Sequence, residues 1–121
     1  MDFTAWRQNV LSAASRAADR TYQECVWFGH DPQRRDSPDD LICTFLDDLV
    51  FEKFLVHPQL SERERKAAAQ LYGAILEYAD STPQVLKPYD VIDDPRFENV
   101  RIAAREFLKI SEQTQSGADD C

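Results

Sequence analysis

The residue types that most often bind metals or catalyse reactions are few in this chain, and they are scattered. There are two histidines, His30 and His57, and three cysteines, Cys25, Cys43 and Cys121. No His-Glu-x-x-His, Glu-x-x-His or Cys-x-x-Cys spacing occurs among them, and these are the usual ligand sets of zinc and di-iron sites. A cysteine or serine nucleophile needs a positioned base, and neither histidine belongs to a motif that supplies one. The sequence therefore predicts no catalytic residue, no metal site and no cofactor.

Two further patterns favour a protein that is not an enzyme. The chain has three glycines, Gly29, Gly73 and Gly117. They are too far apart for a phosphate-binding loop or a dinucleotide-binding motif. The pair Asp47-Asp48 followed by Glu52 is similar to the aspartate-rich magnesium helices of isoprenoid synthases. However, Phe51 occupies the place of the third aspartate, and 121 residues are far too few for that fold. We therefore interpret these acids as solvated helix residues.

The acidic residues are concentrated in two segments, although the chain as a whole has a net charge of −8. Residues 36–60 hold six acidic residues and one lysine, and residues 88–98 hold four acidic residues and one arginine. We call these the first and the second acidic block. An acid in the first turn of a helix stabilises it by about 0.3–1 kcal/mol. This effect explains the acids at the predicted helix starts, but not Asp47, Asp48 and Glu52, which lie further along.

The first acidic block is predicted to form one amphipathic helix. At about 100° per residue, Asp40, Thr44, Asp47 and Phe51 fall on one strip, with Asp48 beside it. The opposite arc is apolar and is expected to face the core; it consists of Ile42, Phe45, Leu46 and Leu49.

Phe51 therefore allows two interpretations. An aromatic side chain on an exposed, charged strip is typical of binding hot spots. Alternatively, Phe51 packs against the 28–36 loop or another helix, and the nearby Phe54 favours such a second buried seam. Tyr89 poses the same question in the second block. The candidate partner-binding residues are Asp40, Asp47, Asp48, Phe51, Glu52, Tyr89, Asp90, Asp93 and Asp94.

The spacing of apolar residues predicts four amphipathic helices and no strands. The helices are expected over residues 4–27, 37–56, 61–81 and 94–110. Ser37, Ser61 and Asp94 are predicted N-caps, and Pro83 is expected to help close the third helix. Residues 82–93 are predicted to form a loop. Four such helices with modest links are typical of an all-α bundle.

Composition limits the class of protein further. A chain of 121 residues suits one domain, which we place at residues 1–112, followed by a polar tail at 113–121. An isoelectric point near 4.6 argues against nucleic-acid binding and against docking on anionic membranes. No signal sequence and no run of about 20 apolar residues is present. The odd, scattered cysteines are typical of a reducing compartment, so we expect a cytoplasmic protein.

The last predicted helix starts with Asp94-Pro95-Arg96-Phe97 and continues with Val100, Ala104, Phe107 and Leu108. This pattern resembles the closing helix of several immunity proteins, which protect bacteria from toxins of colicin and contact-dependent growth inhibition systems. The helix start at residues 37–41 is compatible with the same group. The resemblance implies a protein that binds and neutralises a cognate toxin, blocking its active site or an exosite. Its implied partner is the basic C-terminal toxin domain of a secreted effector.

Electrostatics makes this interpretation coherent, since many such toxins are nucleases with basic substrate clefts. An inhibitor with clustered carboxylates is steered to a basic cleft and associates with it quickly. The alternative is a helical adaptor, regulator or secretion chaperone that binds a basic protein partner.

Overall fold

The computed structural model describes residues 2–82 and 86–119, with side chains up to Gln113, and all regular elements in these ranges are helical. The prediction of an all-α protein is therefore confirmed, while the prediction of about four helices is too low. Seven α-helices and one π-helical turn are present in these ranges: α1 Phe3–Ala18, α2 Arg20–Trp27, α3 Pro38–Cys43, η1 Thr44–Asp48, α4 Phe51–Phe54, α5 Glu62–Ser81, α6 Pro88–Ile92 and α7 Pro95–Asp119.

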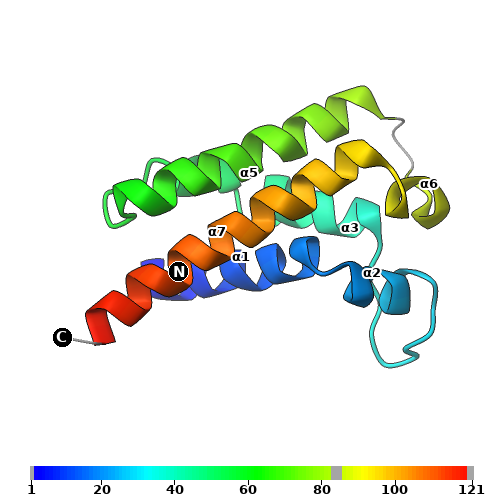
Figure 1. Cartoon of the computed structure of the whole chain (residues 1–121), viewed down its shortest axis with the longest axis horizontal. Helices are drawn as coiled ribbons and strands as arrows, with labels where there is room; N and C mark the ends of the chain where they lie inside the picture. Colours follow the sequence, from blue (N-terminus) through cyan, green and yellow to red (C-terminus); the bar gives the residue numbers. More distant parts are fainter. Residues whose placement is uncertain (1, 83–85, 120–121) are drawn as a thin grey trace.

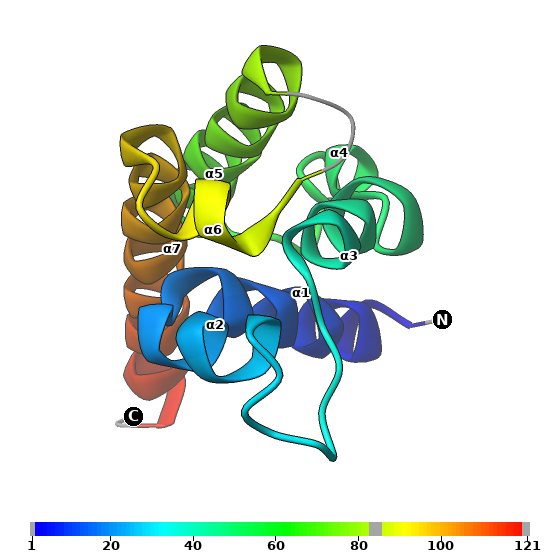
Figure 2. The same cartoon turned by 90° about the vertical axis from the view of Figure 1, so that its right-hand side faces the viewer.

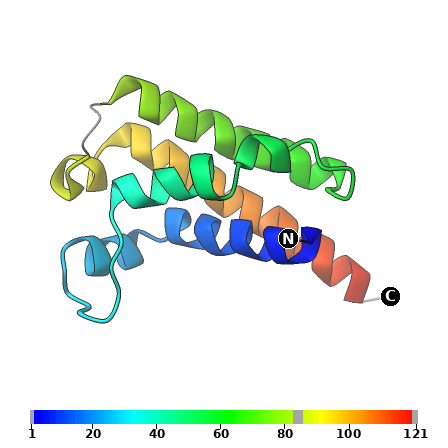
Figure 3. The same cartoon turned by 180° about the vertical axis from the view of Figure 1, so that it is seen from behind.

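The helices are arranged around α7, which packs along both α5 and α1 (Figure 1). Seen from behind, the segment α3–η1–α4 runs between α1 and α5 (Figure 3). These four rods overlap the four segments predicted to be helical, two of which the structure divides into shorter helices. The short helices α2 and α6 contact each other at one end of the bundle (Figure 2). The extra helices therefore arise from interruptions and additions to a four-rod plan.

The first predicted helix is interrupted at Asp19, so the expectation of one helix over 4–27 is wrong. Asp19 leaves the helical conformation (φ −104°, ψ 97°), and its carboxylate accepts a hydrogen bond from the Tyr22 amide at 3.0 Å. An aspartate competes for backbone donors in this way and favours a new helix start. The buried Gln23 side chain donates to the carbonyls of Arg16 and Ala17 at 2.9 Å each, which satisfies the end of α1.

The second predicted helix is interrupted at Val50, so the expectation of one helix over 37–56 is also wrong. Ser37 caps α3 as predicted, with its hydroxyl 3.0 Å from the Asp40 amide. The chain then passes through η1 and turns sharply at Val50, which has a left-handed backbone (φ 46°, ψ 58°). The Trp6 indole N–H donates to the Leu49 carbonyl at 2.7 Å, so the interrupted backbone finds a partner on α1.

The two longest helices begin where the sequence predicts. The Ser61 hydroxyl accepts from the Glu64 amide at 3.2 Å before α5, and the Asp94 carboxylate accepts from the Arg96 amide at 2.8 Å before α7. α7 continues to Asp119, past its expected end near residue 110 and into the predicted tail. None of the helices in the described ranges is both long and apolar enough to cross a membrane.

The predicted loop over 82–93 contains a short helix. α6 starts at Pro88, whose fixed φ suits the first position of a helix, and it buries Val91 and Ile92. Pro83, expected to help close the third helix, lies outside the described residues, as does Cys121.

Candidate functional site

Phe51 lies in the core, which corrects its predicted place on the outward strip. It is 0% exposed, and its ring centroid lies 5.3 Å from Phe45, 5.8 Å from Phe54 and 5.9 Å from Tyr72. The alternative interpretation, a second buried seam with Phe54, describes the structure. The cause is the left-handed turn at Val50, which shifts the helical phase so that residues after it present a different face inward. A fully buried side chain is not available to a partner, so Phe51 leaves the candidate surface.

The acids of the first block that remain at the surface form a group without ion pairs. We call this group the α3–α4 acidic face; its members, all exposed, are Asp40, Asp47, Asp48 and Glu52. No lysine or arginine within the described part of the chain pairs with any of them. Cys43 lies among them: desolvation raises the pKa of its thiol, and the charges of Asp47, Asp39, Asp40 and Asp48 raise it further. Three members of the face therefore converge around one exposed side chain.

The other acids of the first block hold the fold together. Asp39 accepts from the Leu86 amide at 3.2 and 3.3 Å through its two carboxylate oxygens, which ties α3 to the segment before α6. Asp36 accepts from the Tyr22 hydroxyl at 2.9 Å and lies 3.6 Å from the Arg16 guanidinium. These contacts anchor the 28–37 loop against α1 and α2, and they leave the four face residues as the uncommitted acids of this segment.

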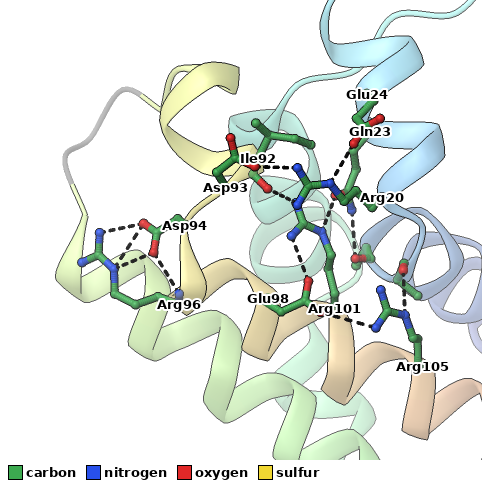
Figure 4. Close-up of polar contacts among 12 residues, drawn as sticks. Arg20, Gln23, Glu24, Ile92, Asp93, Asp94, Arg96, Glu98, Arg101 and Arg105 are labelled. Carbon is green, nitrogen blue, oxygen red and sulfur yellow. Dashed lines mark hydrogen bonds and ion pairs between the residues drawn. The ribbon is translucent and has the colours of Figure 1, made fainter.

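The second block is largely neutralised by arginines (Figure 4). Its ion pairs are Asp93 with Arg20 at 2.5 Å, Asp94 with Arg96 at 2.7 Å, and Glu98 with Arg101 at 3.0 Å and Arg105 at 3.5 Å. Hydrogen bonds from Arg96 lower the pKa of Asp94, and those from Arg101 lower the pKa of Glu98. Asp90 is exposed and is the one acid of this block that has no ion pair among the described residues.

Arg101 is the centre of the neutralising group. Its side chain is 1% exposed, and it donates from Nε to the Gln23 amide oxygen at 2.8 Å and from Nη2 to the Ile92 carbonyl at 2.9 Å. Its guanidinium carbon lies 4.9 Å from the centroid of the Phe97 ring. This one side chain joins α2, the end of α6 and α7. The sequence marks it only as a helix residue three positions after Glu98.

Tyr89 is exposed, unlike Phe51. It is 80% exposed on α6, and its ring meets Phe28 edge-on at a centroid distance of 4.9 Å. It lies next to the unpaired Asp90. Two of the second-block candidates therefore remain available to a partner, whereas Asp93 and Asp94 are engaged with arginines.

A hollow of about 260 Å³ adjoins the α3–α4 acidic face and was not predicted. It is lined by Trp6, Asp48, Leu49, Val50 and Lys53, and we call it the Trp6 hollow. Val50 is 37% exposed here and holds a backbone conformation that β-branched residues rarely adopt. Such strain is concentrated at functional sites. No pattern in the sequence marks Val50 as left-handed, because the conformation is imposed by packing on both sides of it.

The histidines and metal-binding residue types do not gather into a site. His57 stacks on Phe3 at a centroid distance of 4.3 Å, and its Nδ1 accepts from the Gln59 amide at 3.1 Å. His30 is exposed. No group of three or more histidine, cysteine or carboxylate side chains in the described ranges is placed to hold a metal ion.

Comparison with models of known protein families, with curated proteins and with solved structures finds no match to this chain. Its function must therefore be inferred from its own residues, and the feature that stands apart is an unpaired acidic face beside an apolar hollow.

Proposed function

We propose that this protein binds a basic protein partner through the α3–α4 acidic face, and that it is a cytoplasmic immunity protein that neutralises a bacterial toxin domain, specifically a nuclease with a basic substrate cleft. The observation that carries the proposal is that four exposed carboxylates on one segment have no ion pair among the described residues, whereas arginines neutralise most of the second block. The toxin as partner rests on the resemblance of the last helix to those of immunity proteins.

The repulsion among the unpaired carboxylates favours a basic partner. The four carboxylates repel one another, and a partner that brings lysines or arginines relieves this repulsion without breaking an existing pair. Clustered charge of one sign also steers association, which raises the on-rate by about 10- to 1000-fold at low salt. A nuclease cleft built for phosphates supplies the complementary charge.

The Trp6 hollow supplies an apolar anchoring site, which charged residues alone do not provide. Exposed ion pairs contribute about 0–1 kcal/mol each, so a tight complex needs an apolar anchor near its centre. The hollow has Asp48 at its edge and an apolar lining of Trp6, Leu49 and Val50. An apolar side chain of the partner fits there while its basic neighbours meet the acidic face.

The test uses the whole protein as bait in its native lysate, with mass spectrometry of what it retains. The bait is compared with a variant that neutralises the face, Asp40→Asn, Asp47→Asn, Asp48→Asn and Glu52→Gln. A matched control neutralises four exposed acids of α5 and α7 that have no ion pair within the described ranges: Glu77→Gln, Asp80→Asn, Glu106→Gln and Glu112→Gln. We expect the wild type and the control to retain a basic protein that the face variant loses.

A second step tests the toxin assignment. Expression of the captured partner alone is expected to stop bacterial growth, and co-expression of this protein is expected to restore it. Equal retention by both variants would contradict the acidic face as the binding surface. A harmless partner would favour the adaptor, regulator or secretion chaperone instead.

A further inference from the structure

A second pocket, which shares no lining residue with the α3–α4 acidic face, lies where the end of α5, the helix α6 and the start of α7 meet. Its volume is about 260 Å³. Tyr78, Leu86 and Val91 form much of its lining, and Lys87 and Asp90 stand at its exposed edge. The pocket is therefore a small, mainly apolar space with charged groups at its rim.

The hydroxyl of the lining residue Tyr78 is a polar group for which the described part of the chain supplies no partner. Tyr78 is 2% exposed, and its ring is held edge-on against Phe97 at a centroid distance of 5.2 Å. No described residue makes a hydrogen bond with the hydroxyl. In the described part of the chain, one side-chain polar atom is fully enclosed and has no hydrogen-bond partner: the Trp27 indole nitrogen. The Tyr78 hydroxyl is not among such enclosed atoms, and Tyr78 is one of the residues that line the pocket.

The hydroxyl of Tyr78 is protonated and can donate a hydrogen bond. Desolvation, followed by the charge of Asp94, raises the pKa of Tyr78 to about 12, so the phenol stays protonated at neutral pH. A buried donor without an acceptor carries a free-energy cost. An occupant that carries an acceptor, or a water molecule in its place, removes that cost.

The charges around the pocket cancel. Arg96 holds Asp94 through hydrogen bonds from its backbone amide and its guanidinium, and a further guanidinium nitrogen donates to the Ser81 carbonyl at 2.8 Å. Lys87 and Asp90 are the remaining charged lining residues, one of each sign. The lining therefore has no net charge with which to select an ion.

We infer that this pocket binds a small, uncharged, mainly apolar molecule with one carbonyl or hydroxyl oxygen, which accepts a hydrogen bond from the Tyr78 hydroxyl. The apolar walls take up the body of the molecule, and the single buried donor sets its orientation. Small-molecule sites are commonly built in this way, with few polar groups in an apolar lining. The pocket shares no lining residue with the α3–α4 acidic face, and its test uses small molecules without a protein partner, so the test is independent of the proposed function.

The experiment is a titration of the whole protein with acetophenone, followed by two-dimensional amide NMR. Isopropylbenzene has nearly the same shape without the acceptor, and benzoate and benzylammonium carry a charge of either sign. We expect acetophenone to give saturable shifts centred on Tyr78, Leu86 and Val91, and to bind more tightly than the other three probes. Shifts that do not saturate, that lie elsewhere, or that are larger for a charged probe would overturn the inference.

Two variants test the role of the hydroxyl. Tyr78→Phe keeps the ring and is expected to weaken acetophenone binding by about 2- to 10-fold, the effect of one lost hydrogen bond, while isopropylbenzene binds as before. Tyr72→Phe, on the same helix but outside the pocket lining, is the matched control and should bind both probes as the wild type does. Unchanged acetophenone affinity in Tyr78→Phe would refute the assigned donor.

A third variant covers the case in which Tyr78→Phe does not fold. Leu86→Trp enlarges a half-buried wall residue and should fill the space, so acetophenone shifts at Val91 should be lost. Retention of those shifts at wild-type affinity would show that the molecule binds elsewhere.

Discussion

The two acidic blocks look alike in the sequence but are opposites in the structure. In the first, four acids are exposed without ion pairs, and the aromatic residue among them, Phe51, is buried. In the second, three acids are paired with arginines, and the aromatic residue, Tyr89, is exposed. The comparison teaches that a run of acids is not yet an acidic surface, because the arginines that the fold places beside the acids, from nearby positions and from as far away as Arg20, decide which carboxylates remain free.

The source of those cations explains the difference. Arg20 comes from α2, 73 residues before its partner Asp93, while Arg101 and Arg105 lie one and two turns after Glu98 on α7. Among the described residues no arginine or lysine forms an ion pair with the α3–α4 acidic face, whose nearest cation in the sequence is the exposed Lys53. The paired acids of the second block are thereby committed to joining α2, α6 and α7, whereas the α3–α4 acidic face, together with the exposed Tyr89 and Asp90, is left for a partner.

The largest expected effect is on stability, from removal of the buried arginine of the second block. Arg101→Met leaves the Gln23 amide oxygen and the Ile92 carbonyl without their donor, and we expect a loss of about 3–5 kcal/mol in the free energy of unfolding. Arg105→Met removes a 51% exposed arginine from the same group and should cost less than about 1 kcal/mol. Urea unfolding monitored by circular dichroism measures both. Equal losses in the two variants would mean that the second block has no buried centre.

The next effect separates the two aromatic residues. Phe51→Ala opens a cavity in a packed core and should cost about 3–5 kcal/mol, whereas Tyr89→Ala at the surface should cost less than about 1 kcal/mol. In partner binding the order should reverse, because Tyr89 is available for contact and Phe51 is not. Equilibrium unfolding and binding kinetics on both variants check this, and a stable Phe51→Ala protein would contradict the described core.

A smaller effect is expected on the rate of association with the captured partner. Reversing Asp47 and Asp48 to lysine breaks no ion pair in the described ranges, so stability should not fall, but association should slow by about tenfold at low salt. The same reversal at Glu77 and Asp80 of α5 is the control for net charge. Association rates of the two variants with the immobilised partner are measured at two salt concentrations. Equal slowing in both variants would assign the effect to total charge alone.

The smallest effect is the pH dependence contributed by the second block. The folded-state pKa values of Asp94 and Glu98 are lowered, so both groups add stability above their ordinary pKa of about 4. That stability is lost as the pH falls through the lowered values. Because these pairs are partly exposed, we expect their joint contribution to stay within about 1 kcal/mol. The double variant Asp94→Asn and Glu98→Gln should therefore lose less stability than the wild type between pH 7 and pH 3 in urea unfolding. A parallel loss in both proteins would exclude these pairs as the source.

Sequence reasoning succeeded where a few neighbouring residues settle the outcome. The caps at Ser37, Ser61 and Asp94 act within three residues, so the starts of α3, α5 and α7 could be predicted. It failed at Val50 and at α6, where local patterns are ambiguous. Helical periodicity continues across Val50 in the sequence, yet the packing of Phe51, together with the Trp6 hydrogen bond to Leu49, holds a left-handed turn there.

For the candidate site too, some features could be predicted from the sequence and others could not. The sequence alone determines the all-α class and the acidity of two segments. It also raises the question of whether Phe51 and Tyr89 are buried or exposed, without answering it. Which acids stay free, which aromatic residue is buried, and the existence of the Trp6 hollow and the Tyr78 pocket were decided only by the tertiary structure. The physical reason is that caps and helical periodicity are interactions over a few residues. Ion pairing, burial and cavities depend on side chains such as Arg20 and Asp93 that come together only when the chain has folded.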